Sequence, residues 1–101
     1  GIPILAISIG IWEDGKPLMA VVYNPILDEM FWAVAGEGAY CNGDKLSVST
    51  QTRLQQSLIA TGFPYAKVNR GVEYEWVIQS LADLLPNIRD IRRLGAAAID
   101  L

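Results

Sequence analysis

The chain has 101 residues, of which 51% are hydrophobic and 19% charged, with a formal net charge of −3. This composition is too apolar for a disordered chain, and the excess of acids argues against a basic nucleic-acid-binding surface. Because there is no histidine and Cys41 is the single cysteine, the chain cannot hold a Ser-His-Asp triad, a histidine-ligated zinc site or an internal disulfide.

The N-terminal apolar run carries no targeting signal. Glu13–Lys16 interrupts it well short of the ~18 residues that a membrane-spanning helix needs. The run also lacks the basic region of a signal peptide. We therefore expect a cytoplasmic protein with no membrane contact.

The first half predicts antiparallel strands. Residues 4–12 form an apolar, β-rich run that is typical of a strand covered on both faces. Asp14-Gly15 and Asn42-Gly43 are hairpin-turn signals. Four further strands are predicted, over residues 17–23, 30–35, 39–41 and 45–49.

The second half predicts alternating strands and helices. A buried strand is expected over 57–62, a helix over 71–85, a strand over 88–94 and a second helix that opens at Gly95. Pro86 ends the first helix. The broad apolar face expected for that helix consists of Val72, Trp76, Ile78, Leu81, Leu84 and Leu85.

Together these elements predict an α+β or α/β fold, with an antiparallel meander followed by a strand–helix–strand–helix segment. We expect residues 1–55 to form the antiparallel sheet portion of one lobe and residues 56–101 to open a second, α/β lobe. The chain starts without Met and finishes in a helix-forming run with no capping residue. We therefore expect both lobes to be incomplete.

Several motifs have a plain structural explanation. Gly36-Glu37-Gly38 begins like a dinucleotide fingerprint, but it lies between strands and lacks the third glycine, which favours a turn or bulge. The paired acids Glu13-Asp14 and Asp28-Glu29 are expected at turns, where acids are common, rather than as metal ligands.

Two features near the C-terminal end leave alternatives open. Arg89, Arg92 and Arg93 could meet an anionic ligand, or form a solvated strand edge or a subunit contact. Gly95 and the three alanines that follow place small side chains where a strand ends and a helix starts. Small residues there let a ligand approach backbone N–H groups, but they equally allow close packing of a helix on a sheet.

Taken in order, the motifs resemble the inositol monophosphatase family of magnesium-dependent, lithium-sensitive sugar phosphatases, and most closely its bacterial-type branch. The matching segments occur in the family's order along the whole chain. They are Ile7–Gly10, Gly15–Pro17, Val21–Pro25, Asp28–Phe31, Ala33–Ala39, Asn42–Gly43, Ala60–Tyr65 and Arg92–Leu101.

The resemblance implies a partial layered α/β sandwich of the sugar-phosphatase type, corresponding to the middle of a longer domain. It also implies Mg²⁺ as cofactor, with the metal-binding and catalytic acids outside this chain. Mg²⁺ ions lower the pKa of an attacking water and neutralise the leaving oxygen, so this chemistry needs neither histidine nor cysteine.

The resemblance assigns one substrate-binding segment to the chain, namely Gly95, Ala96 and Ala97, which match a Gly-[Ser/Thr]-Ala motif that contacts sugar or inositol hydroxyls. Ala96 departs from the pattern and removes one hydroxyl contact. Thr61–Tyr65 matches a loop near the cleft and the subunit contact, and is a weaker candidate.

The implied function is hydrolysis of inositol 1-phosphate or a similar phosphomonoester by a homodimeric enzyme, while this chain alone is expected to be inactive. Fructose bisphosphate, nucleotide 3′-phosphate and histidinol phosphate are alternative substrates. Another class of function is a regulatory protein that binds the transcription and ribosome-assembly machinery, for which the three arginines are the only hint. The isolated chain could be a compact core or could pair its strand edges with another copy.

Overall fold

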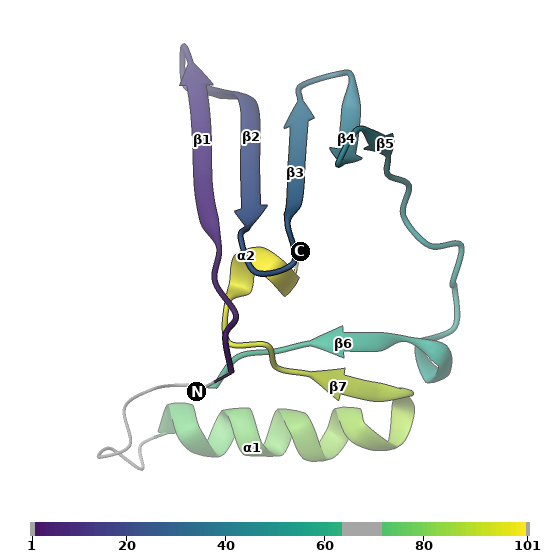
Figure 1. Cartoon of the computed structure of the whole chain (residues 1–101). Coiled ribbons are helices and arrows are strands. Elements are labelled where there is room, and N and C mark those ends of the chain that lie inside the picture. The colour runs from purple at the N-terminus through teal and green to yellow at the C-terminus, as the bar shows by residue number, and fades with distance from the viewer. Residues whose placement is uncertain (1, 64–71, 101) are drawn as a thin grey trace. The chain divides into compact units, whose positions relative to one another are not determined.

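The computed structural model describes residues 2–63 and 72–100, the second range with side chains from Tyr74 onward. The chain forms two compact units, one of Gly1–Ser49 with Leu94–Leu101 and one of Thr50–Arg93. The mixed architecture of a meander followed by strand, helix, strand and helix is confirmed (Figure 1). The assignment of two lobes that meet at residue 55 stays a prediction.

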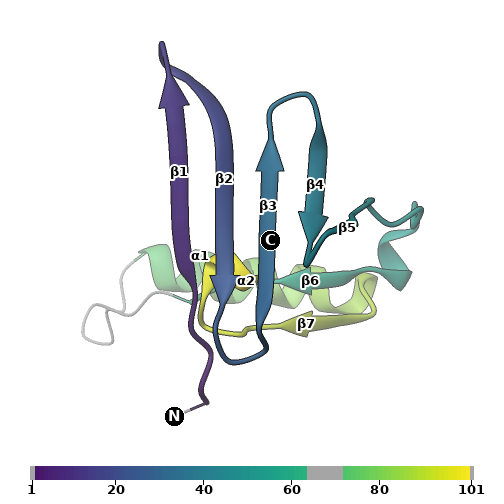
Figure 2. The ribbon, with the colours of Figure 1, turned by 45° about the horizontal axis from the view of Figure 1, so that its top comes forward.

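The first unit contains a five-stranded antiparallel sheet in which neighbouring strands follow each other along the chain (Figure 2). Its strands are β1 (Ile7–Glu13), β2 (Lys16–Asn24), β3 (Glu29–Val34), β4 (Gly38–Cys41) and β5 (Asp44–Lys45). The predicted strand over 45–49 is wrong beyond Lys45. Leu46 donates one more backbone hydrogen bond, to Ala39 O at 2.8 Å, and the residues after it are not part of a strand.

Both predicted hairpin turns are confirmed. Asp14 and Gly15 have φ values of 49° and 75°, and Asn42 and Gly43 have 48° and 93°. Two consecutive positive φ values belong to the type I′ turn, whose twist matches that of the flanking strands. Gly36 and Gly38 lie at the β3–β4 turn with φ values of 80° and 98°, so this glycine pair is a turn.

The two faces of the sheet differ in the size of their side chains. One face carries mostly small residues, and the helix α2 (Ala97–Asp100) packs against it. Its members, here the α2-side face, are Ser8, Gly10, Ala20, Val22, Phe31, Ala33, Ala39 and Cys41. The opposite face, here the open face, consists of Ile7, Ile9, Ile11, Met19, Val21, Tyr23, Met30, Trp32, Val34 and Tyr40.

Burial in the sheet is low. All seven residues of β1 are exposed, so the prediction that both faces of this strand are covered is wrong for this chain. The apolar run indicated a strand suited to burial, but this strand is the first of the sheet and pairs with β2 alone. Among the described residues no hydrophobic side chain is fully buried, whereas the polar Asn24 is only 3% exposed.

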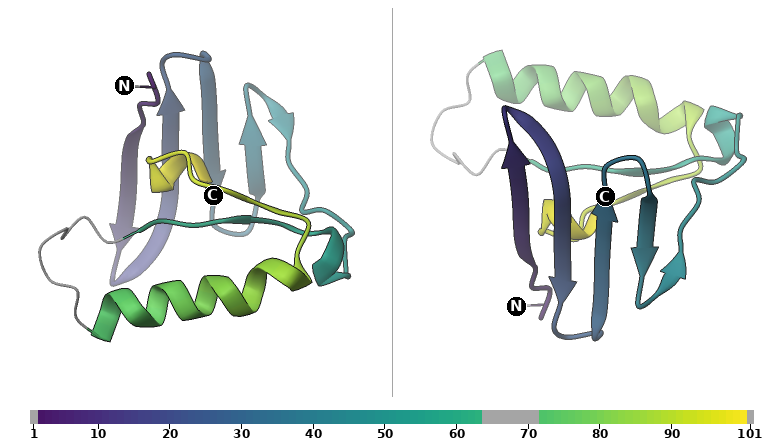
Figure 3. Two further views of the ribbon diagram at one scale, coloured as in Figure 1. Left: turned by 90° about the horizontal axis from the view of Figure 1, so that it is seen from below. Right: turned by 90° about the horizontal axis from the view of Figure 1, so that it is seen from above.

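The second unit pairs two parallel strands, β6 (Leu58–Ala60) and β7 (Asp90–Arg92), in register from Leu58 opposite Asp90 to Ala60 opposite Arg92. The helix α1 (Val72–Leu84) connects them and runs alongside the pair (Figure 3). Short 3₁₀ turns lie over Leu54–Gln56, before β6, and over Leu85–Asn87, after α1.

The apolar face predicted for α1 is partly wrong. The half-buried positions are Val77, Leu81 and Leu84, which share one side of the helix at spacings of four and three residues. Trp76 is 69% exposed and Ile78 47%, because they point to either side of that stripe. In the part of the chain that the structure describes, no helix is long and apolar enough to cross a membrane.

Candidate functional site

The segment predicted to bind substrate forms the bend that leads into α2. Gly95 has a φ of 90°, and a Cβ built there would meet no atom within 4 Å. Glycine is therefore required by the backbone conformation rather than by crowding. Because of this bend the helix begins at Ala97, not at Gly95 as the sequence predicted. Ile99 N–H donates to Ala96 O at 2.9 Å and so closes the first turn.

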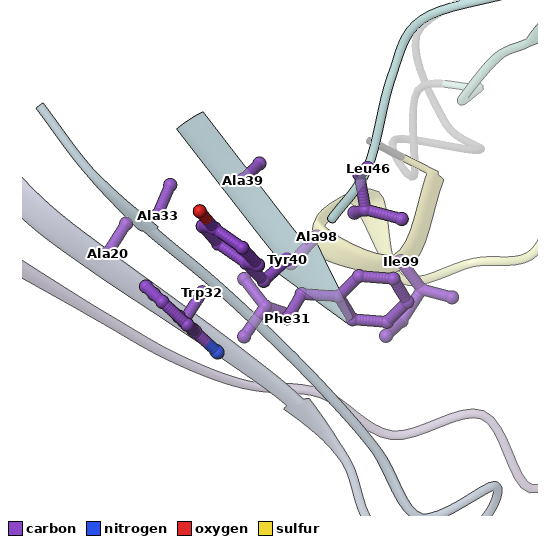
Figure 4. Close-up of a pocket in the computed structure, with 10 residues that line it drawn as sticks. Ala20, Phe31, Trp32, Ala33, Ala39, Tyr40, Leu46, Ala98 and Ile99 are labelled. Carbon is purple, nitrogen blue, oxygen red and sulfur yellow. The ribbon is translucent and has the colours of Figure 1, made fainter. Parts of the chain in front are cut away.

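A shallow hollow of about 210 Å³ lies where α2 meets the sheet (Figure 4). Its lining is almost wholly apolar, which suits helix packing and offers little to a phosphate group. The lining residues are Ala20, Val22, Phe31, Trp32, Ala33, Ala39, Tyr40, Leu46, Ala98 and Ile99. Ala98 thus serves close packing, while the assignment of Gly95, Ala96 and Ala97 to substrate stays a prediction.

The arginines near the end of β7 have separate partners. Arg92 Nη1 donates to Asp90 Oδ2 at 2.7 Å and to Ile91 O at 2.8 Å. The hydrogen bond from Arg92, followed by the one from Ile91 N–H, lowers the pKa of the exposed Asp90 carboxyl below its ordinary value. The Arg93 guanidinium lies 5.2 Å from the centroid of the Phe63 ring. Arg92 and Arg93 therefore do not converge on one anion site.

Arg89, the third arginine of the cluster, precedes β7 in the second unit. Together with Arg92 it lines an open hollow of about 360 Å³ that also contains Gln56, Leu58 and Asp90. Asp90 supplies a negative charge to this hollow, so its net charge is small. Whether Arg89 and Arg92 contact an anionic ligand stays a prediction.

The first residue of the loop after β6 is hydrogen-bonded to β7. Thr61 N–H donates to Arg92 O at 2.9 Å, which extends the β6–β7 pairing by one bond. Phe63 lies under the Arg93 guanidinium, a favourable cation–π arrangement. Pro64 and Tyr65, also part of the predicted loop candidate, lie outside the described residues.

The acidic pairs occupy turns, as the sequence predicted. Glu13 lies opposite Lys16 across the β1–β2 turn. Asp28 Oδ1 accepts a hydrogen bond of 2.7 Å from the Tyr23 hydroxyl. The described residues contain no group of three or more His, Cys, Asp or Glu side chains that could hold a metal ion. The resemblance likewise implies that the magnesium ligands lie outside this chain, and that stays a prediction.

Two asparagines have a structural role that the sequence did not reveal. Asn42 Oδ1 accepts from Met30 N–H at 2.8 Å, and Asn42 Nδ2 donates to Asp28 O at 3.0 Å. Asn24 Oδ1 accepts from the N–H groups of Ile26 and Leu27 at 3.1 and 3.3 Å. The Asn-Gly and Asn-Pro pairs signalled turns, but not the bridge that Asn42 makes across twelve or more residues.

The family model for the inositol monophosphatase family matches residues 1–101. Inositol monophosphatase 1 of Solanum lycopersicum is 38% identical over 101 residues, which are all of this chain and 36% of that protein. Nus factor SuhB of Escherichia coli K12 is 38% identical over 100 residues, 99% of this chain and 36% of that protein.

Among solved structures, the extragenic suppressor protein suhB from Bartonella henselae superposes with a TM-score of 0.89 at 37% identity. The match covers 98% of this chain and 37% of that one. The chain thus spans little more than a third of the length of these relatives. Because the family model matches the whole chain and the structural match agrees in fold, the chain belongs to the inositol monophosphatase family.

Proposed function

We propose that a protein of the family's full length that contains residues 1–101 is a phosphomonoesterase. Its proposed substrate is inositol 1-phosphate or a similar sugar or polyol phosphate. The observation that carries this proposal is the family match over residues 1–101, without a gap at either end. The tomato relative that is 38% identical bears the name of inositol monophosphatase, which supports the substrate class.

Within this proposal, Gly95, Ala96 and Ala97 contact the hydroxyl groups of the substrate. Gly95 and Ala97 are exposed and Ala96 is half-buried, and small side chains allow a polyol to approach backbone N–H groups at such a segment. Ala96 supplies no hydroxyl where the family pattern has Ser or Thr. We therefore expect weaker binding of the polyol part of the substrate, and unchanged chemistry at the phosphate.

The catalytic and metal-binding acids are proposed to lie outside residues 1–101, as the resemblance to the family implies. Mg²⁺ is the proposed cofactor, and when bound it activates the attacking water. By itself the 101-residue chain is expected to be inactive. A homodimeric, cytoplasmic state of the family-length protein stays part of the proposal.

The test is phosphate release by a purified family-length protein that contains residues 1–101. Inositol 1-phosphate, fructose bisphosphate and a nucleotide 3′-phosphate are supplied in turn, with Mg²⁺ and then with Mg²⁺ removed by chelation. We expect release from inositol 1-phosphate that needs Mg²⁺ and is inhibited by Li⁺. Ala96→Ser is expected to lower the KM for inositol 1-phosphate by about 2- to 10-fold, the value of one hydrogen bond. Absence of release from every phosphomonoester would overturn the proposal.

A second candidate function is regulatory binding to the transcription machinery. It is favoured by the 38% identity to the protein named Nus factor SuhB. The candidate contacts are Arg89, Arg92 and Arg93, all of which are exposed. In a pull-down with purified RNA polymerase and antitermination factors, this function predicts binding that Arg89→Ala with Arg92→Ala weakens. Failure of the family-length protein to recover any of these components would contradict it.

A further inference from the structure

We propose that Asn42 is a site of spontaneous deamidation, and that opening of the contact between the β2–β3 turn and the β4–β5 turn sets the rate of this reaction. The modification converts the side-chain amide of Asn42 into a carboxylate. It consumes water and needs no enzyme or cofactor. It concerns the sheet and not the phosphate chemistry, so it stands apart from the proposed function.

The sequence distinguishes Asn42 from the other asparagines of the chain. Asn42 is followed by glycine, whereas the asparagines at positions 24, 69 and 87 are followed by proline, arginine and isoleucine. Deamidation begins when the backbone nitrogen of the next residue attacks the side-chain carbon Cγ. Because Gly43 has no side chain, nothing on that residue hinders the approach.

The reaction balances without an oxidant or reductant. Gly43 N loses its proton and forms a bond to Asn42 Cγ, the bond from Cγ to Nδ2 breaks, and the amide nitrogen leaves as ammonia. The product is a cyclic imide. Water then adds to either carbonyl carbon of this ring and opens it to aspartate or to isoaspartate.

Three hydrogen bonds hold Asn42 in the folded sheet. Its N–H donates to Met30 O at 2.9 Å, and its Oδ1 accepts from Met30 N–H at 2.8 Å. Its Nδ2 donates to Asp28 O at 3.0 Å. Attack on Cγ makes this planar carbon tetrahedral and moves Oδ1 and Nδ2 away from their partners. Both side-chain hydrogen bonds must therefore break before the reaction starts.

The rate of deamidation thus follows the population in which the two turns have separated. Loss of two hydrogen bonds corresponds to a reaction about 30-fold slower in the folded state than in the unfolded chain. Both partners of the Asn42 side chain are backbone groups of the same sheet. The match in fold with a longer relative supports the same turns in a family-length protein.

The product cannot restore the contact between the turns. A carboxylate at position 42 has no hydrogen to donate to Asp28 O, and it places a negative charge beside that carbonyl oxygen. Isoaspartate also lengthens the main chain by one methylene, within the turn where Cys41 pairs with Asp44. Deamidation is therefore a one-way loss of this contact.

The test follows deamidation in a purified family-length protein that contains residues 1–101, at mildly alkaline pH and below its unfolding temperature. Peptide mass spectrometry measures aspartate and isoaspartate at position 42 over time, in the folded protein and in guanidinium chloride. In the unfolded chain we expect Asn42 to react faster than the other three asparagines. In the folded protein it should react at least about 30-fold more slowly. Equal rates in the two states would overturn the proposal.

Two matched variants test whether the contact between the turns sets the rate. Asp28→Val and Glu37→Val each remove one exposed acid from a turn of the sheet, but only Asp28 has a positive φ, of 53°, which a β-branched residue tolerates poorly. Asp28→Val shifts the backbone oxygen of residue 28 away from Asn42, and should speed deamidation of the folded protein about 10-fold. Glu37→Val lies at the β3–β4 turn, at the other end of β3, and should leave the rate unchanged.

Equal rates in the two folded variants would contradict the proposal. If Asp28→Val fails to fold by circular dichroism, the same comparison is made with Asp28→Ala and Glu37→Ala. The readout is the modification itself and does not depend on phosphatase activity.

Discussion

The indole ring of Trp32 and the phenol ring of Tyr40 stack across β3 and β4, with centroids 4.2 Å apart and an interplanar angle of 11°. The two residues are directly opposite in the strand register. Stacked pairs of this kind contribute about 0.5–1.5 kcal/mol beyond the area they bury.

A double-mutant cycle of Trp32→Ala and Tyr40→Ala should therefore give a coupling free energy of about 1 kcal/mol in urea unfolding. The same cycle between Trp32→Ala and Val48→Ala should be additive within about 0.5 kcal/mol, since Val48 lies outside the sheet. Equal coupling in both cycles would show that the ring contact contributes nothing specific.

Asn42 holds the β2–β3 turn to the β4–β5 turn through Met30 N–H and Asp28 O. We expect Asn42→Ala to lower the free energy of unfolding by roughly 2 kcal/mol, because two backbone groups lose their partner. Asn42→Gly loses the same bonds but suits the positive φ of 48°. It should be less destabilising than Asn42→Ala. Chemical denaturation measures both, and equal stability of Asn42→Ala and wild type would contradict the bridge.

Gly95 and Gly62 form a matched pair for testing the bend before α2. An added Cβ meets nothing within 4 Å at either residue, but only Gly95 has a positive φ, of 90°. Gly95→Ala should therefore destabilise the chain by about 1–2 kcal/mol. Gly62→Ala should be neutral, or stabilising by up to about 1 kcal/mol. Thermal unfolding of the two variants gives the comparison, and equal losses would rule out backbone conformation as the cause.

The Tyr23 hydroxyl donates to Asp28, and this hydrogen bond, followed by desolvation and the Asp28 charge, raises the pKa of Tyr23 above its ordinary value of 10.0. A raised folded-state pKa contributes stability below the unfolded-state pKa, and that stability is lost as pH rises through the folded-state value. Asp28→Asn should return the pKa toward its ordinary value. Ultraviolet titration of tyrosinate measures this, with Tyr23→Phe to identify the signal. An unchanged titration curve in Asp28→Asn would contradict the contact.

Much of the sheet could be predicted from short-range chemistry. Asp14-Gly15 and Asn42-Gly43 specify type I′ turns locally, so the strands around them follow in order. The end of β5 could not be predicted, because residues 46–49 have strand composition, although the strand itself ends at Lys45. The buried side of α1 was likewise predicted wrongly at Trp76 and Ile78. Large hydrophobic residues occupy both the half-buried and the exposed positions of this helix, so hydrophobicity alone does not identify the buried side.

The candidate site was less accessible to prediction than the fold. The sequence predicted that Gly95 opens the last helix, but its φ of 90° makes a bend there and the helix begins at Ala97. The separate partners of Arg92 and Arg93, namely Asp90 and Phe63, depend on contacts within the folded second unit. No spacing rule in the sequence gives such contacts.

Phosphate release from inositol 1-phosphate in the presence of Mg²⁺, measured side by side for the 101-residue chain and for a family-length protein that contains it, tests the central claim most directly. We predict Mg²⁺-dependent release by the family-length protein and none by the 101-residue chain. Release by the 101-residue chain, or none by a folded family-length protein, would contradict the account.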